Sequence, residues 1–172
     1  MEYKNAMQKP RIDKVVLNIG VGSSGEELGR AEKLLRKLTN RTPIRTTSKH
    51  KIPAWNIRKR EPIGCKVTLR GKDAVEILKR GLYAKDNRLG ANNFDDAGNV
   101  AFGVQEYIDI KDIKYDPEIG IYGLNFNVTL ERPGYRVKRR RLAKAKVPKK
   151  HNVKKEEAIG FMKENFGVEI EQ

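Results

Sequence analysis

Three glycines in the stretch GVGSSG, at residues 20–25, have the spacing with which some enzymes bind a dinucleotide. The stretch follows a predicted strand and precedes a predicted helix, which is the context that this motif requires. The motif also needs an acid about 20 residues further on, to bind the ribose of the cofactor. Residues 33–60 contain no acid. We therefore interpret the glycines as a turn in which the backbone passes close to a neighbouring segment. The backbone amides of this turn are also suited to binding an RNA phosphate.

Side chains that commonly catalyse reactions or bind metals are few and scattered. His50 and His151 lie far apart in the sequence, and Cys65 has no second cysteine with which to form a ligand pair. Cys65 falls on the inward phase of a predicted strand, which favours an inert core thiol. Asp95 and Asp96 are adjacent in a loop rich in Asn and Gly, where acids usually form turns. The sequence therefore predicts no enzyme, no catalytic residue, no metal site and no cofactor.

The positive charge of the chain is concentrated in two segments. The net charge is +15, from 37 Lys and Arg residues against 22 acids. Residues 33–60 carry ten Lys or Arg and residues 132–155 carry twelve, and neither segment contains an acid. Segregated charge of this kind favours a polyanionic partner, and we predict nucleic acid rather than a membrane surface. The sequence has no run of about 18 apolar residues, which predicts no membrane-spanning segment, and its single cysteine predicts a reducing compartment.

Alternation of apolar and polar residues predicts an antiparallel sheet. Residues 14–19, 63–70 and 124–132 place apolar side chains on one face and polar side chains on the other, and residues 43–47 and 100–107 are further predicted strands. Such alternation is typical of a sheet that is covered on one side only. The outward positions predict an open polar face that carries Asn18, Lys66, Thr68, Arg70, Asn125, Asn127 and Thr129.

Helices are predicted to cover the other face of the sheet. The first begins at a capping box of Ser23 and Glu26 and ends near residue 40, and Asp73 caps the second. A third runs over about residues 154–166 and ends at Gly167. Residues 87–99 between these helices are predicted to form a polar loop.

These elements predict one α+β domain, residues 1–172, with helices packed on one face of the sheet. A basic loop at about residues 48–61 protrudes from it, and a basic extension with a C-terminal helix occupies about residues 132–172. The order of elements also resembles an RNA-recognition motif, which stacks bases on aromatic residues of its central strands. Here those outward positions hold no aromatic residue. This favours contact with the phosphates, riboses and groove edges of a folded RNA.

The only tryptophan, Trp55, lies in the basic loop rather than on an apolar run, and no acid occurs in this loop before Glu61. We interpret the loop as an arm whose cations follow phosphates and whose Trp55 stacks on a ribose or base. The alternative is that Trp55 folds back over the edge of the domain as a lid.

The run PIGCKVTLRG, at residues 62–71, together with NIGVG at residues 18–22, resembles the L-five family of large-subunit ribosomal proteins, called L-eleven in eukaryotic naming. The resemblance covers nearly the whole chain. The basic segment and KHNVKKEEA at residues 150–158 are more similar to archaeal and eukaryotic members than to bacterial ones. The family implies a non-enzymatic protein of the cytoplasmic ribosome. It also implies binding of 5S rRNA, attachment of this RNA in the central protuberance, and a loop 48–61 that reaches peptidyl-site tRNA. Further implied partners are large-subunit rRNA and neighbouring ribosomal proteins.

The resemblance and the charge pattern together give three sets of candidate RNA-binding residues. At Arg41, where many bacterial members have glutamine, a phosphate contact is expected. The 5S rRNA set is Asn18, Gly20, Gly22, Arg41, Thr42, Arg45, Thr47, Lys66, Thr68 and Arg70. The tRNA set is Lys49, His50, Lys51, Trp55, Asn56, Arg58, Lys59 and Arg60. The set for other RNA is Arg136, Lys138, Arg139, Arg140 and Arg141.

Three questions stay open at the level of sequence. The basic segment 132–155 either contacts large-subunit rRNA or is a tail that orders only on assembly. The acidic segment 106–118 is either a solvated loop or, as the resemblance implies, a bridge to a basic protein of the small-subunit head. The alternative to a ribosomal protein is a free-standing RNA-binding regulator or assembly factor that uses the same open face.

Overall fold

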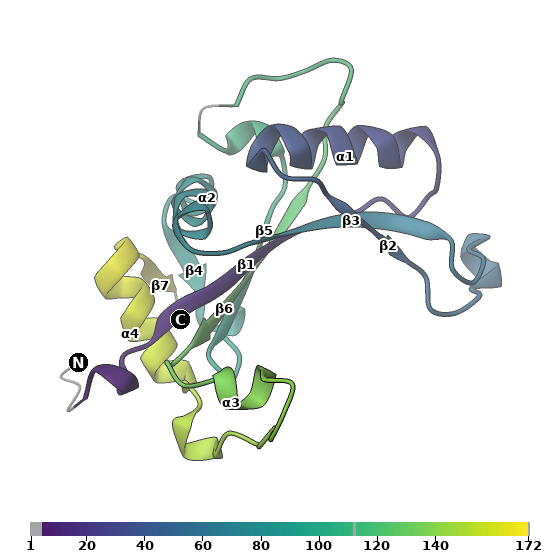
Figure 1. Cartoon of the computed structure of the whole chain (residues 1–172). Coiled ribbons are helices and arrows are strands. Elements are labelled where there is room, and N and C mark those ends of the chain that lie inside the picture. The colour runs from purple at the N-terminus through teal and green to yellow at the C-terminus, as the bar shows by residue number, and fades with distance from the viewer. Residues whose placement is uncertain (1–4, 112, 172) are drawn as a thin grey trace.

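The computed structural model describes residues 5–111 and 113–171, and Figure 1 shows their arrangement. Within these residues, five strands form an antiparallel sheet in the order β2-β3-β1-β6-β5. The α+β fold with an antiparallel sheet is therefore confirmed. The strands of this sheet are β1 Arg11–Gly20, β2 Ile44–Thr47, β3 Pro62–Leu69, β5 Asn99–Val104 and β6 Leu124–Glu131. The α-helices are α1 Glu26–Thr39, α2 Lys72–Tyr83, α3 Arg136–Arg139 and α4 Lys155–Phe166. Short 3-10 helices lie at Ala6–Gln8, Pro53–Trp55, Ala91–Asn93, Tyr107–Asp109 and Lys149–His151.

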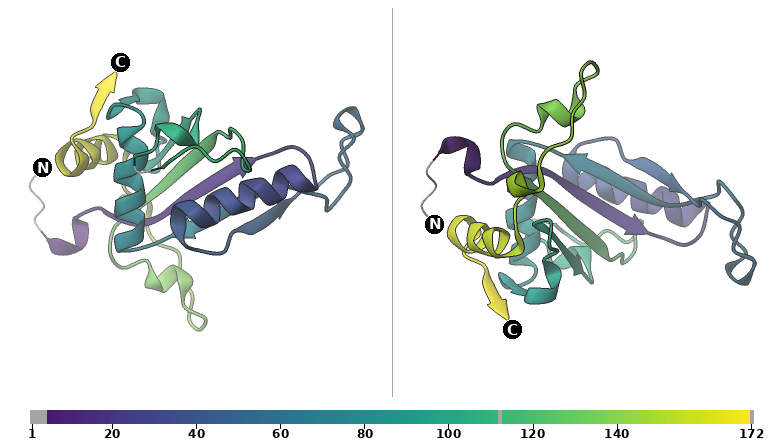
Figure 2. Two further views of the ribbon diagram at one scale, coloured as in Figure 1. Left: turned by 90° about the horizontal axis from the view of Figure 1, so that it is seen from above. Right: turned by 90° about the horizontal axis from the view of Figure 1, so that it is seen from below.

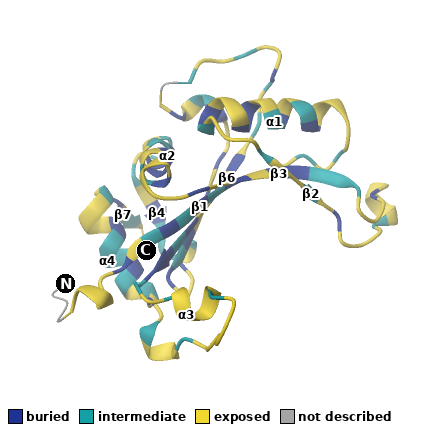
Figure 3. Cartoon of the chain, in the orientation of Figure 1, coloured by how far each residue is buried: buried dark blue, intermediate teal, exposed yellow. Residues whose placement is uncertain are grey.

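The helices α1 and α2 cover the same face of the sheet, and the core lies between them and the strands (Figures 1 and 3). Gly81 of α2 lies so close to the sheet that a Cβ atom at this position would come within 2.5 Å of the ring of Phe126. Phe126 in turn stacks on Phe102 of β5, with ring centroids 5.0 Å apart. The close packing of α2 therefore depends on a glycine. The apolar side of α1 follows the predicted spacing and buries Leu28, Ala31, Leu34, Leu35 and Leu38.

A glycine stands at the capping position before each of these two helices. The predicted capping by Ser23 and Asp73 is therefore wrong. Gly25 precedes α1 and Gly71 precedes α2, and neither helix has a capping hydrogen bond from a side chain. Both glycines have a positive φ, because the chain turns sharply from a strand or loop into the helix, and glycine adopts such a conformation without strain. Asp73 instead lies in the first turn of α2.

The ends of α1 and α4 match the predictions. Asn40 after α1 and Gly167 after α4 both take the left-handed conformation that commonly ends a helix. In both cases the backbone N–H of this residue donates to a carbonyl one turn earlier, which satisfies one of the free carbonyls of the helix end.

The segment 87–99 is not only a polar loop, as predicted, because it contains a short strand. β4, Arg88–Gly90, pairs in parallel with β7, Glu169–Glu171. Leu89 and Phe94 of this segment are buried in the core. The prediction failed because β4 is only three residues long and its partner lies at the other end of the chain, where local patterning gives no signal.

Candidate nucleic-acid interface

The face of the sheet opposite α1 and α2 carries polar side chains in rows across three strands. Asn18 of β1 pairs with Lys66 of β3 on one side and with Asn125 of β6 on the other. Lys66 and Asn125 are exposed and Asn18 is half-buried. This open face, seen from below in the right panel of Figure 2, presents hydrogen-bonding groups on rigid strands. The next row places the exposed Thr68 and Asn127 on either side of Val16.

The edge of the open face continues into a groove beside β2. This groove has a volume of about 540 Å³, and its lining includes Arg41, Thr42, Lys66, Thr68 and Arg70. Arg41 also forms an ion pair with Asp73, at 2.6 Å from Nη2 to Oδ2, but its side chain remains 63% exposed. The structure therefore brings these five residues of the predicted 5S rRNA set together.

Arg45 and Thr47 of the same predicted set lie apart from this groove. Arg45 pairs with Cys65, whose side chain points into the core, so Arg45 projects toward the helices. There it donates to Glu32 of α1, and this hydrogen bond and the charge of Glu32 raise the pKa of the Arg45 guanidinium. Thr47 pairs with Pro62 at the base of the basic loop.

The glycine turn after β1 does not serve the close backbone approach that we predicted for it. A Cβ atom at Gly20, Gly22 or Gly25 would meet nothing within 4 Å. Gly22 and Gly25 are needed instead for their positive φ. The amides of Val21 and Gly22 both donate to the carbonyl of Ile63, which leaves neither free for a phosphate. Close approach occurs at Gly64, where a Cβ atom would lie 2.7 Å from the carbonyl oxygen of Ile19.

The first turn of α1 after this glycine turn is acidic. It contains Glu26 and Glu27, and Glu27 also accepts a hydrogen bond from the hydroxyl of Ser23. Two carboxylates at a helix N-terminus occupy the position where a phosphate would otherwise be favoured. This arrangement argues against a dinucleotide at the GVGSSG stretch.

The basic loop 48–61 forms an arm that extends beyond β2 and β3, at the right of Figure 1. Ile52 and Ile57 exchange backbone hydrogen bonds of 2.9 and 3.1 Å, so the arm is a small hairpin rather than an irregular loop. Ile57 is buried, whereas Trp55 at the tip is 71% exposed. The lid alternative for Trp55 is therefore wrong. The other predicted tRNA-binding residues are also exposed, namely Lys49, His50, Lys51, Asn56, Arg58, Lys59 and Arg60.

Glu61 fixes the base of the arm. Its carboxylate accepts from the backbone N–H of Arg58 at 2.7 Å and from the hydroxyl of Ser24 at 2.7 Å. These two hydrogen bonds outweigh desolvation and lower the pKa of Glu61 below its usual value. The arm is thus attached to the glycine turn, which lies at the end of the open face.

The basic extension, here residues 132–154 between β6 and α4, is held to the rest of the molecule at its two ends. It is therefore not a free tail. Arg132 forms an ion pair with Glu157 of α4, and both side chains are largely buried. His151 Nε2 lies 2.7 Å from the carbonyl oxygen of Pro133. The hydroxyl of Tyr135 donates to Asn152 Oδ1 at 2.8 Å. These contacts join the beginning of the extension to its end, and the residues between them, including α3, form a closed loop below the sheet (Figure 1).

Four of the five cations predicted in this extension are exposed and Arg140 is half-buried, but Arg139, whose side chain is 50% exposed, has a special environment. Arg136, Lys138 and Arg141 are exposed, and Arg140 donates from Nε to the carbonyl of Ala143 at 2.8 Å. Arg139 instead binds two carboxylates, those of Asp13 and Glu131. Sequence analysis missed both acids. The alternation of β1 places Asp13 two residues before Val15, in phase with the buried side chains, and this spacing could have predicted that Asp13 is buried.

The acidic segment 106–118 lies on the opposite side of the molecule from the extension, above α1 in Figure 1. Asp116 is hydrogen-bonded to Lys37 of α1 at 2.9 Å, and this bond lowers the pKa of Asp116. Asp112, another acid of this segment, lies outside the described residues. The segment is therefore remote from the open face, as its charge requires if that face binds RNA.

The thiol of Cys65 is shielded in the core. Cys65 is fully buried, and burial raises the pKa of its thiol to about 11. Among residues 5–111 and 113–171, no group of three or more His, Cys, Asp or Glu side chains is placed to hold a metal ion. None of the helices in this described part is long and apolar enough to cross a membrane.

An antiparallel α+β fold with an open polar face between two basic segments is typical of proteins that bind folded RNA. Comparison with known families identifies the class. Residues 5–58 match the family model for ribosomal protein L5, and residues 62–161 match the model for the C-terminal part of the same ribosomal family.

Individual relatives extend the similarity over nearly the full chain. The large ribosomal subunit protein uL5 of Methanosphaera stadtmanae is 52% identical over 167 residues, which cover 97% of this chain and 99% of that protein. The uL5 protein of Methanococcus aeolicus is 49% identical over 172 residues, with coverage of 98% and 95%. That of Sulfurisphaera tokodaii is 51% identical over 167 residues, with coverage of 96% and 94%.

The chain therefore belongs to the ribosomal protein L5 family, and its resemblance to archaeal members is confirmed. Members of this family are structural, non-enzymatic constituents of the large ribosomal subunit in the cytoplasm, with rRNA and other ribosomal proteins as partners.

Proposed function

We propose that this chain binds 5S rRNA through its open face and helps to attach that RNA in the central protuberance of the large subunit. The observation that carries the proposal is the open face itself, which presents polar side chains on rigid strands between the two basic segments. Such a face fits the riboses and groove edges of a folded RNA, where shape and the 2′-hydroxyl are recognised. The basic segments add charge, which supplies most of the affinity for a nucleic acid.

Within this proposal, the 5S rRNA contacts are made by the residues that share the open face and its groove. Asn18, Lys66 and Thr68 lie on the face, and Arg41, Thr42 and Arg70 line the groove at its edge. Gly20 and Gly22 contribute through the course of the backbone at the end of β1, and Thr47 contributes from the base of the arm. Arg45 takes part only if its ion pair with Glu32 opens.

The arm is proposed to contact peptidyl-site tRNA. It extends away from the sheet, exposes Trp55 at its tip, and carries Lys49, Lys51, Arg58, Lys59 and Arg60 with no acid before Glu61. An exposed aromatic ring among cations is suited to stacking on a base or ribose while the cations contact phosphates. His50 and Asn56 lie in the same hairpin and complete the proposed contact surface.

The extension is proposed to contact large-subunit rRNA with Arg136, Arg140 and Arg141, whereas Lys138 faces the groove between the extension and the open face. The acidic segment 106–118, on the other side of the molecule, is proposed to bridge to a basic protein of the small-subunit head. We further propose that the sheet, the arm and the extension act as one RNA-binding domain over residues 1–172.

The experiment that tests this function is a titration of the purified chain with 5S rRNA and with an unrelated folded RNA of similar length. Binding is measured at about 50 and about 200 mM salt, a range over which contacts to phosphates alone lose much of their affinity. We expect 5S rRNA to bind about a hundredfold more tightly than the unrelated RNA at the higher salt concentration. Equal affinities that both fall with salt would leave only the charge effect and would refute specific binding of 5S rRNA.

A stable fraction of the protein outside ribosomes would support the alternative, a free-standing RNA-binding regulator or assembly factor. Sedimentation of a cell extract, followed by detection of this chain across the gradient, separates the two functions.

A further inference from the structure

The end of the open face that lies next to the extension holds two buried carboxylates. Asp13 is 8% exposed and Glu131 is 4% exposed. Asp13 reaches this face because β1 contains a bulge, in which Ile12 pairs with Leu130 and Lys14 pairs with Thr129, so that Asp13 has no partner of its own on β6. Burying two carboxylates is costly unless cations lie beside them.

Arg139 of the extension binds both carboxylates. Its Nη1 donates to Asp13 Oδ1 at 3.2 Å and to Glu131 Oε1 at 3.4 Å, and its Nη2 donates to Asp13 Oδ2 at 2.9 Å and to Glu131 Oε2 at 2.6 Å. Desolvation opposes the charge of Arg139, but the hydrogen bonds and charges of Asp13 and Glu131 outweigh it and raise the pKa of the guanidinium. Four of its five N–H groups are thus used within the protein. Arg139 therefore docks the extension on the sheet, while half of its side chain remains exposed.

Two further arginines surround the same carboxylates. Arg70 donates to the side chain of Asp13, and Arg11 Nη2 lies 3.7 Å from Glu131 Oε1. The side chains of both arginines remain more than half exposed. We call the set of Asp13, Glu131, Arg139, Arg70 and Arg11 the clasp. It joins β1 and β6 of the sheet to the extension.

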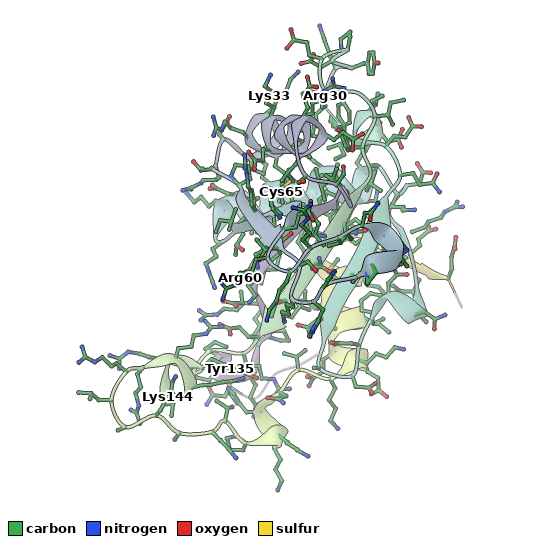
Figure 4. All side chains as sticks on the ribbon, turned by 90° about the vertical axis from the view of Figure 1, so that its right-hand side faces the viewer. Arg30, Lys33, Arg60, Cys65, Tyr135 and Lys144 are labelled. Carbon is green, nitrogen blue, oxygen red and sulfur yellow. The ribbon has the colours of Figure 1, made fainter. Side chains whose placement is uncertain are left out.

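Three residues of the clasp, Asp13, Glu131 and Arg139, line a groove between the open face and the extension. The groove has a volume of about 550 Å³. Lys14 and Thr129 line it from the sheet, and Tyr135, Lys138 and Lys144 line it from the extension. The two acids that also line it are already paired with arginines, so the three lysines give the groove an excess of positive charge. Figure 4 shows Tyr135 and Lys144 together on the extension, far from Arg30 and Lys33 of α1 on the covered side.

We propose that this groove is a binding site for the sugar–phosphate backbone of RNA, and that Asp13, Glu131 and Arg139 are positioning residues that hold its lysines in place. The site rests on the proposed function in one respect, namely that the bound polyanion is RNA. The groove is continuous with the open face through Lys14 and Thr129, so an RNA lying on that face passes through it. Its volume is large enough for about one nucleotide.

The proposal and a simple charge effect predict opposite changes in RNA affinity when an acid of the clasp is neutralised. Asp13→Asn and Glu131→Gln each remove one negative charge, so electrostatic attraction alone would strengthen binding of any RNA. Loss of the clasp would instead free the extension and weaken binding, by about tenfold for 5S rRNA at about 200 mM salt. The matched control is Glu26→Gln, which makes the same change of charge at the start of α1, and which is expected to bind RNA as tightly as the wild type or slightly more tightly.

Arg139→Lys gives a second test, because it keeps the net charge and removes the bidentate contacts. It is expected to weaken binding to the same extent as Asp13→Asn. The double variant Lys138→Ala with Lys144→Ala is expected to reduce the slope of log affinity against log salt by about two. Added to Arg139→Lys, these alanines should cause little further loss, because the lysines are already displaced. A structural role alone would not change the salt dependence in this way.

Thermal unfolding of each variant is measured first, and binding is measured well below the unfolding temperature. If Asp13→Asn does not fold, Glu131→Gln and Arg139→Lys decide the question. The proposal is overturned if these variants bind RNA as tightly as Glu26→Gln does. A wild type that binds 5S rRNA and the unrelated RNA equally would refute the proposed function, but the comparison among variants on either RNA would still decide whether the groove binds phosphates.

Discussion

The arm and the extension are both basic and both free of acids over most of their length, yet they are built in different ways. The arm is a hairpin held by its own backbone, with Ile52 and Ile57 paired near the tip and Glu61 at its base. The extension has little secondary structure apart from α3 and is held by side chains that reach it from β1, β6 and α4. A segment of high charge can thus be positioned either by its backbone or by acids that lie elsewhere in the sequence.

This difference determines what each segment can do. The arm is fixed at one end only, so its tip is free to adapt to a partner that moves, such as a tRNA. The extension is fixed at both ends and by Arg139 between them, so Lys138 and Lys144 are held beside the open face. We therefore expect damage to the arm to affect binding alone, and damage to the attachments of the extension to affect stability as well.

The largest difference between the two segments should appear in the stability of variants that lose one arginine. Arg132→Ala removes the charged partner of Glu157 and leaves a largely buried carboxylate with only the backbone N–H of Lys154 as a hydrogen-bond donor. We expect the free energy of unfolding to fall by about 3 kcal/mol. Urea unfolding followed by circular dichroism measures this change.

Two matched variants control this prediction. Arg136→Ala removes an exposed arginine from the same extension, and Arg58→Ala removes an exposed arginine from the arm. Each should change the free energy of unfolding by less than about 0.5 kcal/mol. If Arg132→Ala were as stable as these two, the extension would not depend on its ion pair with α4.

The next largest effect should separate the two segments by their RNA partners. Arg58→Ala combined with Lys59→Ala removes two charges from the arm, and we expect it to lower crosslinking to peptidyl-site tRNA about fivefold while the affinity for 5S rRNA changes less than about twofold. Arg140→Ala combined with Arg141→Ala removes two charges from the extension and should leave the tRNA crosslink unchanged. Large loss of 5S rRNA affinity in the arm variant would show that the segments do not divide their partners.

A smaller effect should appear when the pH is lowered, and of the two segments only the arm should show it. The pKa of Glu61 is lowered in the folded protein by hydrogen bonds from the Arg58 amide and the Ser24 hydroxyl. A lowered pKa stabilises the folded base of the arm at pH values above the usual value of 4.5, and this contribution is lost as the pH falls toward the folded pKa.

Amide hydrogen exchange at Arg58, after correction for the intrinsic pH dependence of exchange, measures this loss. We expect protection at this amide to decrease below about pH 4.5 in the wild type. Glu61→Gln should show low protection at all pH values. Equal decreases at amides of the extension would indicate general unfolding rather than release of the arm.

The smallest expected effect concerns Cys65, which serves as a probe of the shared core. Burial raises the pKa of this thiol to about 11, so very little thiolate is present at neutral pH and a thiol reagent should react slowly. The arm variant Arg58→Ala with Lys59→Ala should react at the wild-type rate. Faster labelling in that variant would mean that changes in the arm reach the sheet, which would contradict the independence of the two segments.

Much of the sheet could be predicted from sequence because its signals are local. The alternation over residues 14–19, 63–70 and 124–132 identified three strands and the open face correctly. The spacing of leucines identified α1, and the single tryptophan in a basic loop pointed to the exposed position of Trp55. In each case, the residues that determine the structure lie within one element.

The missed features all depend on partners that are distant in the sequence. Asp13 and Arg139 are 126 positions apart, and no periodicity links them. The bulge that turns Asp13 toward the open face adds one residue to β1 without a local signature. The parallel pairing of β4 with β7 likewise joins segments from different parts of the chain. The charge of the extension could therefore be predicted, but the pairing of Arg139 with Asp13 and Glu131 could not.

The contacts of Arg132, Tyr135 and His151 close the extension into a loop whose two ends meet beside α4. A protease that cuts between residues 140 and 147 would therefore produce two fragments, and α4 and β7 would stay assembled with the sheet through noncovalent contacts. The nicked protein would elute as one species and separate only in denaturant. An intact loop is thus not needed to keep the C-terminal helix in place.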